Sequence, residues 1–223
     1  MTAIAIDGPA GAGKSTVARR VADELGFLYV DTGALYRAIG LFMLGKGADP
    51  GDPRSVIPLL KEVSVSLANG GNQVFLNGED VSDKIRSDDV SMAASRVSAI
   101  PEVRSFLLSL QRDIAENNNV VMDGRDIGTV ILPDAEVKIF LTASPEERAK
   151  RRYLQLLRNG MKANYEDVLE DLKQRDYNDS HRAVAPLKQA DDAVLVDTTG
   201  DTLEKSSARL VQIVKSKIHG EIS

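Results

Sequence analysis

The sequence Gly8-Pro-Ala-Gly-Ala-Gly-Lys14-Ser15 decides the fold, because it matches the phosphate-binding pattern G-x-x-x-x-G-K-[ST] in full. Ile4-Ala-Ile6 precedes it as a short apolar strand, and apolar residues at helical spacing follow it. A glycine-rich turn without a ligand would not need this lysine and serine after the last glycine. We therefore predict that the loop binds a nucleoside triphosphate. Its nucleotide-binding residues are Gly8, Pro9, Ala10, Gly11, Ala12, Gly13, Lys14, Ser15 and Thr16.

The chemistry of the loop explains these residue types. Glycines let successive backbone N–H groups wrap the β-phosphate, and the start of the following helix adds partial positive charge. Lys14 offers a cation to the β- and γ-phosphates. The Ser15 hydroxyl is a ligand suited to Mg²⁺, whose other ligands would be phosphate oxygens and water. We therefore expect Mg²⁺ to bind together with the nucleotide.

Strand-like and helix-like segments alternate along most of the chain. Further apolar strands are predicted at residues 27–30, 120–122, 137–141 and 193–196, with amphipathic helices between them. Such alternation is typical of parallel strands joined by crossover helices. We predict an α/β fold in which a five-stranded parallel sheet has helices on both faces. Residues 1–223 are expected to form a single domain of this type.

One segment departs from this alternation. Residues 63–67 and 73–76 alternate apolar and polar side chains on either side of Asn69-Gly-Gly-Asn72. This pattern predicts an antiparallel hairpin. We expect an inserted, β-containing subdomain over residues 46–90.

Composition excludes several classes of protein. The chain has 223 residues, 43% of them hydrophobic, which is enough to form a globular core. It lacks cysteine and has two histidines, so it offers little for a thiolate nucleophile, a zinc site or a Ser-His-Asp triad. The net charge of −5 argues against binding nucleic acid or acidic lipid. With neither a signal peptide nor an apolar run of membrane length, we expect a cytoplasmic protein, and we expect a monomer.

Two further motifs follow predicted strands, at the sheet edge where open α/β folds bind ligands. Asp31-Thr-Gly-Ala-Leu-Tyr-Arg37 places a guanidinium where it could bind an acceptor phosphate, although a solvated helix charge is the alternative. Asp123-Gly-Arg-Asp-Ile-Gly128 contains glycines that suggest close approach of a ligand. Asp123 could contact Mg²⁺ through water, and capping of the nearby loop is its alternative.

A basic segment lies later in the chain. Residues 148–162 contain six basic residues and no acidic one. Arg148, Arg151 and Arg152 share one helical face, which suggests a lid over anionic substrates at residues 148–164. A solvated charged face is the alternative, and it is favoured for Lys150, Arg158 and Lys162.

The P-loop alone does not separate a kinase from a GTPase or a transport ATPase. The chain contains neither an Asn-Lys pair, as a GTPase base-reading motif requires, nor a Ser-Gly-Gly signature. Together with the motifs at Arg37, Asp123–Gly128 and Arg182-Ala-Val-Ala-Pro-Leu187, the sequence resembles the bacterial cytidylate kinases over residues 2–218. These belong to the nucleoside monophosphate kinases, so the resemblance implies the P-loop kinase fold, with residues 46–90 as the inserted monophosphate-binding subdomain and residues 148–164 as a helical lid. Thr32 is a small departure, since serine is equally expected there.

The resemblance implies transfer of the γ-phosphoryl group from MgATP to CMP, and to dCMP as well. It also implies roles for individual residues. The transfer itself is assigned to Lys14, Arg125, Arg148, Arg152 and Arg182. CMP is expected to contact Thr32, Arg37, Ser95, Arg104, Arg125, Asp126, Arg175, Asp179 and Arg182. Ser95, Arg104 and Asp126 would face the base, Arg175 and Asp179 the ribose, and Arg37, Arg125 and Arg182 the phosphate.

Two alternatives stay open on the sequence. Another small-molecule kinase of the same fold, acting on UMP, AMP or shikimate, would share the P-loop. A regulatory module that slowly hydrolyses ATP would not need arginines clustered opposite that loop.

Overall fold

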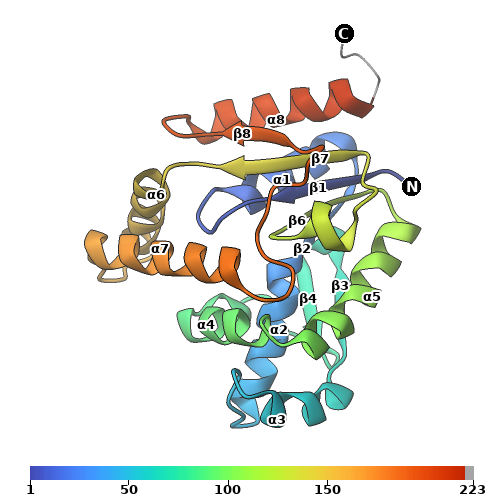
Figure 1. Ribbon diagram of the computed structural model, residues 1–223, viewed down its shortest axis with the longest axis vertical. Coiled ribbons are helices and arrows are strands. Elements are labelled where there is room, and N and C mark those ends of the chain that lie inside the picture. Colours follow the sequence, from blue (N-terminus) through green and yellow to red (C-terminus); the bar gives the residue numbers. More distant parts are fainter. Residues whose placement is uncertain (219–223) are drawn as a thin grey trace. The chain divides into compact units, whose positions relative to one another are not determined.

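The computed structural model describes residues 1–218 as an α/β fold built on a parallel sheet (Figure 1). The strand order is β2-β6-β1-β7-β8, so the predicted five-stranded sheet is confirmed. Ile4 lies opposite Val137 in the parallel β1–β7 pair, and Ile139 lies opposite Val194 in the β7–β8 pair. The strands are β1 (Ala3–Asp7), β2 (Leu28–Asp31), β6 (Val120–Gly124), β7 (Val137–Thr142) and β8 (Val194–Asp197).

α-Helices separate these strands in the chain, as the sequence predicts, except between β6 and β7, where a single π-helical turn, Ile127–Ile131, makes the connection. Pro101 occupies the first turn of its helix, and Ser144 caps the next one by accepting a hydrogen bond from the Glu147 N–H at 3.2 Å. The helices are α1 (Lys14–Leu25), α2 (Thr32–Gly45), α3 (Pro53–Val56), α4 (Asp88–Val97), α5 (Pro101–Asn117), α6 (Pro145–Arg158), α7 (Tyr165–His181) and α8 (Leu203–Ile218).

The chain forms two compact units, which we describe separately. The first consists of residue 1 with residues 27–120, and the second of residues 2–26 with the chain from residue 121 onward. The first unit contains the predicted hairpin, β3 (Val65–Ala68) and β4 (Gln73–Leu76), extended by β5 (Glu79–Asp80). The extents that the sequence suggests for the domain, the insertion and the lid stay predictions.

Close helix packing shapes the first unit. A Cβ atom added at Gly40 of α2 would lie 2.9 Å from the Ala94 nitrogen of α4. Glycine therefore lets these two helices approach within backbone contact. Leu35, Ile39 and Met43 on α2 are fully buried in the apolar core of this unit.

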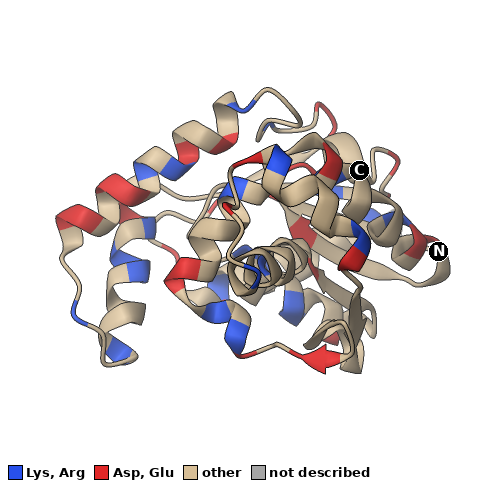
Figure 2. Cartoon of the chain, turned by 90° about the horizontal axis from the view of Figure 1, so that it is seen from below, with Lys and Arg blue, Asp and Glu red and all other residues tan. Residues whose placement is uncertain are grey.

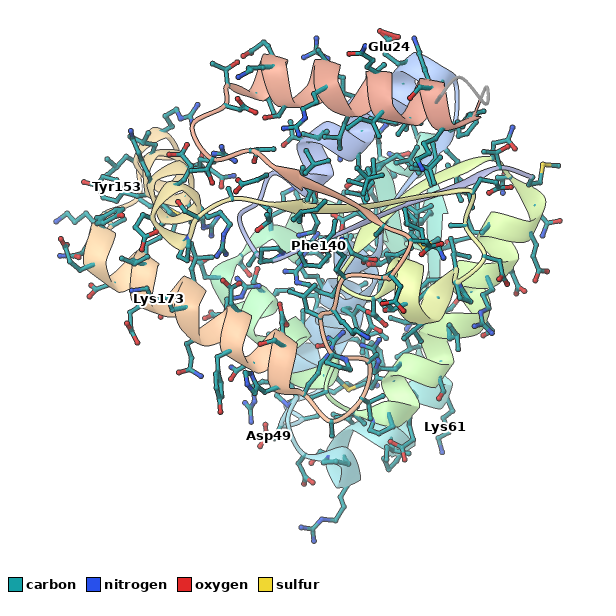
Figure 3. The ribbon with its side chains drawn as sticks, turned by 45° about the horizontal axis from the view of Figure 1, so that its top comes forward. Glu24, Asp49, Lys61, Phe140, Tyr153 and Lys173 are labelled. Carbon is teal, nitrogen blue, oxygen red and sulfur yellow. The ribbon has the colours of Figure 1, made fainter. Side chains whose placement is uncertain are left out.

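In the second unit, apolar strands and one amphipathic helix position the P-loop. β1 is almost entirely buried, and α1 buries Val17 and Val21 among other apolar residues on one side. Lys215 of α8 donates to Glu24 of α1 at 3.3 Å, where the two helices pack together (Figure 3). The P-loop residue Ala10 packs in an apolar cluster with residues of α6 and α7. The loop is therefore supported by apolar contacts with these two helices.

Charged residues are spread over the helices. Figure 2 shows Lys and Arg interspersed with Asp and Glu along most of them. Within residues 1–218, no helix combines the length and the apolar character that crossing a bilayer requires.

Candidate active site

The P-loop joins β1 to α1 through a backbone that requires glycine. Gly8 has φ +149°, and a Cβ atom there would lie 1.9 Å from the carbonyl oxygen of Leu141 on β7. Gly11 and Gly13 have φ values of +74° and +87°. Residues with a side chain rarely adopt such positive φ values. The glycines therefore allow the loop to curve, and they let its backbone approach a phosphate closely.

Lys14 begins α1 and is bent back over the loop. Its side chain is 6% exposed, and its ammonium donates to the Pro9 carbonyl oxygen at 2.7 Å. Burial, and after it the nearby Arg125 guanidinium, lower the pKa of Lys14 to about 7. The lysine of the P-loop and an arginine of the acceptor motif therefore lie close enough to interact electrostatically.

Ser15 and Asp123 meet beside the P-loop. The Ser15 hydroxyl donates to Asp123 Oδ2 at 2.9 Å, and Asp123 is buried at the end of β6. A hydroxyl and a carboxylate are oxygen ligands of the kind that Mg²⁺ prefers. Within residues 1–218, no group of three or more Asp, Glu, His or Cys side chains could hold a metal. The residues present thus fit a metal that is held mainly by nucleotide phosphates.

Two arginines of the acceptor motifs form ion pairs. Arg125 donates to Asp179 at 2.7 Å and Arg182 to Asp126 at 3.1 Å. Burial opposes the charge of Arg125, but Asp179 and then Asp123 outweigh it and raise the pKa of Arg125 above its usual range. Arg125 is therefore a permanent cation in this site.

The structure thus brings together four of the residues that the resemblance assigns to CMP, which are Arg125, Asp126, Asp179 and Arg182. Arg175 lies on α7, one turn before Asp179, with its side chain exposed.

The predicted lid arginines have different surroundings. Arg148 is 3% exposed, and it donates to the P-loop carbonyl of Ala10 at 2.9 Å and to Asp176 of α7 at 2.6 Å. Arg151 contacts the Thr198 carbonyl oxygen at 2.7 Å. Arg152 donates to Gln155, one turn further along α6. Arg148 therefore links the P-loop to the α6–α7 pair.

The remaining predicted CMP residues belong to the first unit. Thr32 is buried at the start of α2, which Asp31 caps by accepting from the Ala34 N–H at 2.9 Å. Arg37 pairs with that same carboxylate at 2.8 Å. Arg104 of α5 is 5.8 Å from the ring centroid of Tyr36, a cation–π geometry.

Ser95 lies on the exposed side of α4. Its backbone carbonyl accepts from the Ser98 hydroxyl at 2.9 Å.

Sequence reasoning missed two carboxylates of this region. Asp7, the last residue of β1, is 5% exposed and accepts hydrogen bonds from the N–H groups of Ile127 and Gly128, both at 2.8 Å. Asp176 is the partner of Arg148. A carboxylate between an apolar strand and a P-loop was the available signal for Asp7, whereas nothing local marks Asp176.

The comparisons with known proteins agree on one family. A family model described as cytidylate kinase matches residues 4–216. The protein named cytidylate kinase from Caldanaerobacter subterraneus subsp. tengcongensis is 52% identical over 219 residues, covering 98% of this chain and 97% of the relative. The protein of the same name from Caldicellulosiruptor bescii is 46% identical over 221 residues and covers 98% of both chains.

A solved structure of an uncharacterized protein from Eubacterium ventriosum ATCC 27560 shares the fold. Its TM-score is 0.52 at 14% identity, covering 97% of this chain and 99% of that one. Since the family match spans nearly the whole chain and agrees with the P-loop geometry, the chain belongs to the cytidylate kinase family and is a phosphotransferase.

Proposed function

We propose that the protein transfers the γ-phosphoryl group of ATP to CMP and dCMP, giving ADP with CDP or dCDP. One observation carries the proposal: the P-loop Ser15 hydroxyl donates to Asp123 at 2.9 Å, which joins the P-loop to the motif that carries Arg125, and Arg125 also interacts electrostatically with Lys14. A cation that suits an acceptor phosphate and one that suits the γ-phosphate are therefore neighbours in the second unit. Phosphoryl transfer requires two phosphate groups to be held side by side in this way.

On the donor side, the loop amides from Gly8 to Gly13 would bind the β-phosphate. Lys14 would exchange its contact with the Pro9 carbonyl for the β- and γ-phosphates, whose negative charge favours the protonated ammonium. Ser15 would hold Mg²⁺, with Asp123 acting through water. The metal, when bound, neutralises phosphate charge and orients the two terminal phosphates.

On the acceptor side, no general base is needed. The phosphate of CMP is largely ionised at neutral pH, so one of its oxygens can attack the γ-phosphorus directly. A new P–O bond forms as the bond to the ADP oxygen breaks in line, and the bonding electrons leave with ADP. We propose that Lys14, Arg125, Arg148, Arg152 and Arg182 stabilise the charge of this transition state.

Asp126 would select the base. Its carboxylate can accept a hydrogen bond from the N4 amino group of cytosine, whereas the O4 of uracil would be repelled. The buried ion pair with Arg182 fits this role, because it fixes the orientation of the Asp126 carboxylate. We assign the other contacts as the resemblance implies. They are Ser95 and Arg104 to the base, Arg175 and Asp179 to the ribose, and Thr32, Arg37, Arg125 and Arg182 to the phosphate.

Water must be excluded while two polyanions react, so we propose that residues 148–164 act as a lid. The segment includes most of α6 and the turn before α7. Its anchor at Arg148 is buried against the P-loop carbonyl of Ala10, so nucleotide binding to the loop could be relayed to the helix. The monomeric state and the cytoplasmic location stay predictions.

The proposal is tested by ADP formation with CMP, dCMP, UMP, AMP and shikimate as acceptors. We expect ADP formation to require CMP or dCMP, with little product from the others. Asp126→Asn offers uracil O4 a donor, so the CMP-to-UMP ratio of kcat/KM should fall by at least about tenfold. The matched control Asp171→Asn, on the exposed surface of α7, should keep the ratio. ADP formation that ignores every acceptor, or an unchanged ratio in Asp126→Asn, would contradict the proposal.

A further inference from the structure

Asp7 makes a two-point contact that the transfer reaction does not use directly. Oδ1 accepts from the Ile127 N–H and Oδ2 from the Gly128 N–H, each at 2.8 Å. The carboxylate thus occupies both amides that follow Asp126 in the chain. Gly128 is close to it, since a Cβ atom there would lie 3.5 Å from Asp7 Oδ2 and 3.2 Å from the Lys138 side chain.

This contact is made at a cost in electrostatic energy. Burial raises the pKa of Asp7 to about 6, against the opposing effect of the two amide hydrogen bonds. The Asp126 carboxylate contributes to this raised pKa and Lys14 opposes it, so Asp7 lies near charged groups of both substrate sites. An apolar side chain would pack at the end of β1 without this penalty. The presence of a carboxylate at this buried position therefore needs an explanation. The turn that it binds, through the Ile127 and Gly128 amides, provides one.

Asp126 directly precedes the two residues whose amides Asp7 binds. Asp126 has φ −145° and ψ 28°, outside the regular helix and strand conformations, and its carbonyl oxygen accepts from the N–H groups of Val130 and Ile131 at 2.9 and 3.1 Å. Its side chain pairs with Arg182. Asp7 holds the two peptide N–H groups after Asp126, so it limits the backbone rotation that would move the Asp126 carboxylate.

We infer that Asp7 is a positioning residue for base recognition, which ties the turn bearing Arg125 and Asp126 to the strand that enters the P-loop. The inference rests on the proposed role of Asp126 in reading cytosine. Two acceptor atoms are required, because the two amides are both donors. An asparagine at position 7 keeps one acceptor and turns an N–H₂ group toward the other amide. Even this isosteric change should release one side of the turn.

The first test compares Asp7→Asn with the control Asp134→Asn, an exposed carboxylate before β7. At pH 7.5, Asp7→Asn should lower the CMP-to-UMP ratio of kcat/KM by about tenfold and raise the KM for CMP, while the KM for ATP changes less than about twofold. The control should leave all three unchanged. Equal losses for CMP and UMP, or a change confined to ATP, would overturn the inference.

A second measurement is independent of activity. Amide hydrogen exchange, followed by NMR in the ligand-free protein, should show at least about tenfold less protection at Ile127 and Gly128 in Asp7→Asn, with β7 unaffected. Unchanged protection would overturn the inference, and so would lost protection with an intact CMP-to-UMP ratio. If the wild type failed to phosphorylate CMP, the proposed function would fail, and the exchange data would still test the contact.

Should Asp7→Asn fail to fold, Gly128→Ala perturbs the same contact from the other side. The added methyl group would lie 3.2 Å from the Lys138 side chain, which must shift, and 3.5 Å from Asp7 Oδ2, so it crowds the turn that Asp7 holds. This variant should show less exchange protection at the amide of position 128, and its CMP-to-UMP ratio of kcat/KM should fall as in Asp7→Asn. A Gly128→Ala protein with a wild-type ratio and lost protection would overturn the inference.

Discussion

Ionisation of Asp7 should make the free energy of unfolding depend on pH, and the substitution Asp7→Asn should remove this dependence. The pKa of Asp7 is about 6 in the folded chain and 3.8 in its ordinary state. The folded state therefore holds its proton more tightly than the unfolded state. This stabilisation is fully present below pH 3.8 and is lost as the pH rises through 6.

Linkage gives the size of the effect. With these two pKa values, the bound proton contributes about 1.4 kcal/mol to the free energy of unfolding at pH 5 and nearly nothing at pH 7.5. Asp7→Asn cannot ionise, so it lacks this dependence. The difference in unfolding free energy, wild type minus Asp7→Asn, should therefore fall by about 1.4 kcal/mol between pH 5 and pH 7.5.

Urea unfolding at five pH values, followed by circular dichroism, measures this difference. The comparison cancels the titration of the shared carboxylates that do not interact with Asp7. Asp134→Asn is the control, because it removes one carboxylate at an exposed position. Parallel curves for Asp7→Asn and the wild type over this range would refute the reasoning, since Asp7 would then titrate alike in both states.

Three further predictions concern the nucleotide site. ATP binding at pH 8 should take up about one proton, because the phosphate charge restores the ammonium form of Lys14, whose pKa is about 7. Calorimetry in buffers of different ionisation enthalpy measures this proton uptake, and its absence would contradict the prediction. Gly8→Ala should destabilise the fold by at least about 3 kcal/mol in urea unfolding, since the added Cβ meets a Leu141 backbone atom. Gly45→Ala is the control, because a Cβ there meets open space, and equal stabilities of the two variants would argue against the loop geometry. Proteolysis near Gly160 should slow when a bisubstrate analogue closes the lid, and equal cutting rates would count against closure.

The sequence predicted the elements whose signals are local. The P-loop, the five strands and the hairpin at residues 65–76 follow from motif, alternation and turn residues, and the structure confirms them. Gly26 ends α1 in the left-handed conformation. Helix α2 begins at Thr32, because Asp31 caps it. Strand β5 was not predicted, since two exposed residues carry no pattern.

The functions of single charged residues were harder to predict. Helical spacing correctly placed Arg148 and Arg151 on a basic helix, yet it could not show what they contact. Arg148 binds the P-loop carbonyl of Ala10, and Arg151 binds the carbonyl of Thr198, far away in the sequence. The contact of Asp7 with Gly128 also joins distant segments. Such partners depend on tertiary structure, which periodicity does not describe.

A crystal structure with a bisubstrate analogue that joins adenosine and cytidine through five phosphates tests the central claim most directly. We predict phosphates against the amides of Gly11 to Lys14 and against the guanidinium groups of Arg125 and Arg182, with the cytosine amino group on Asp126. A cytidine bound elsewhere, with Arg125 and Arg182 still paired only to their carboxylates, would contradict the claim.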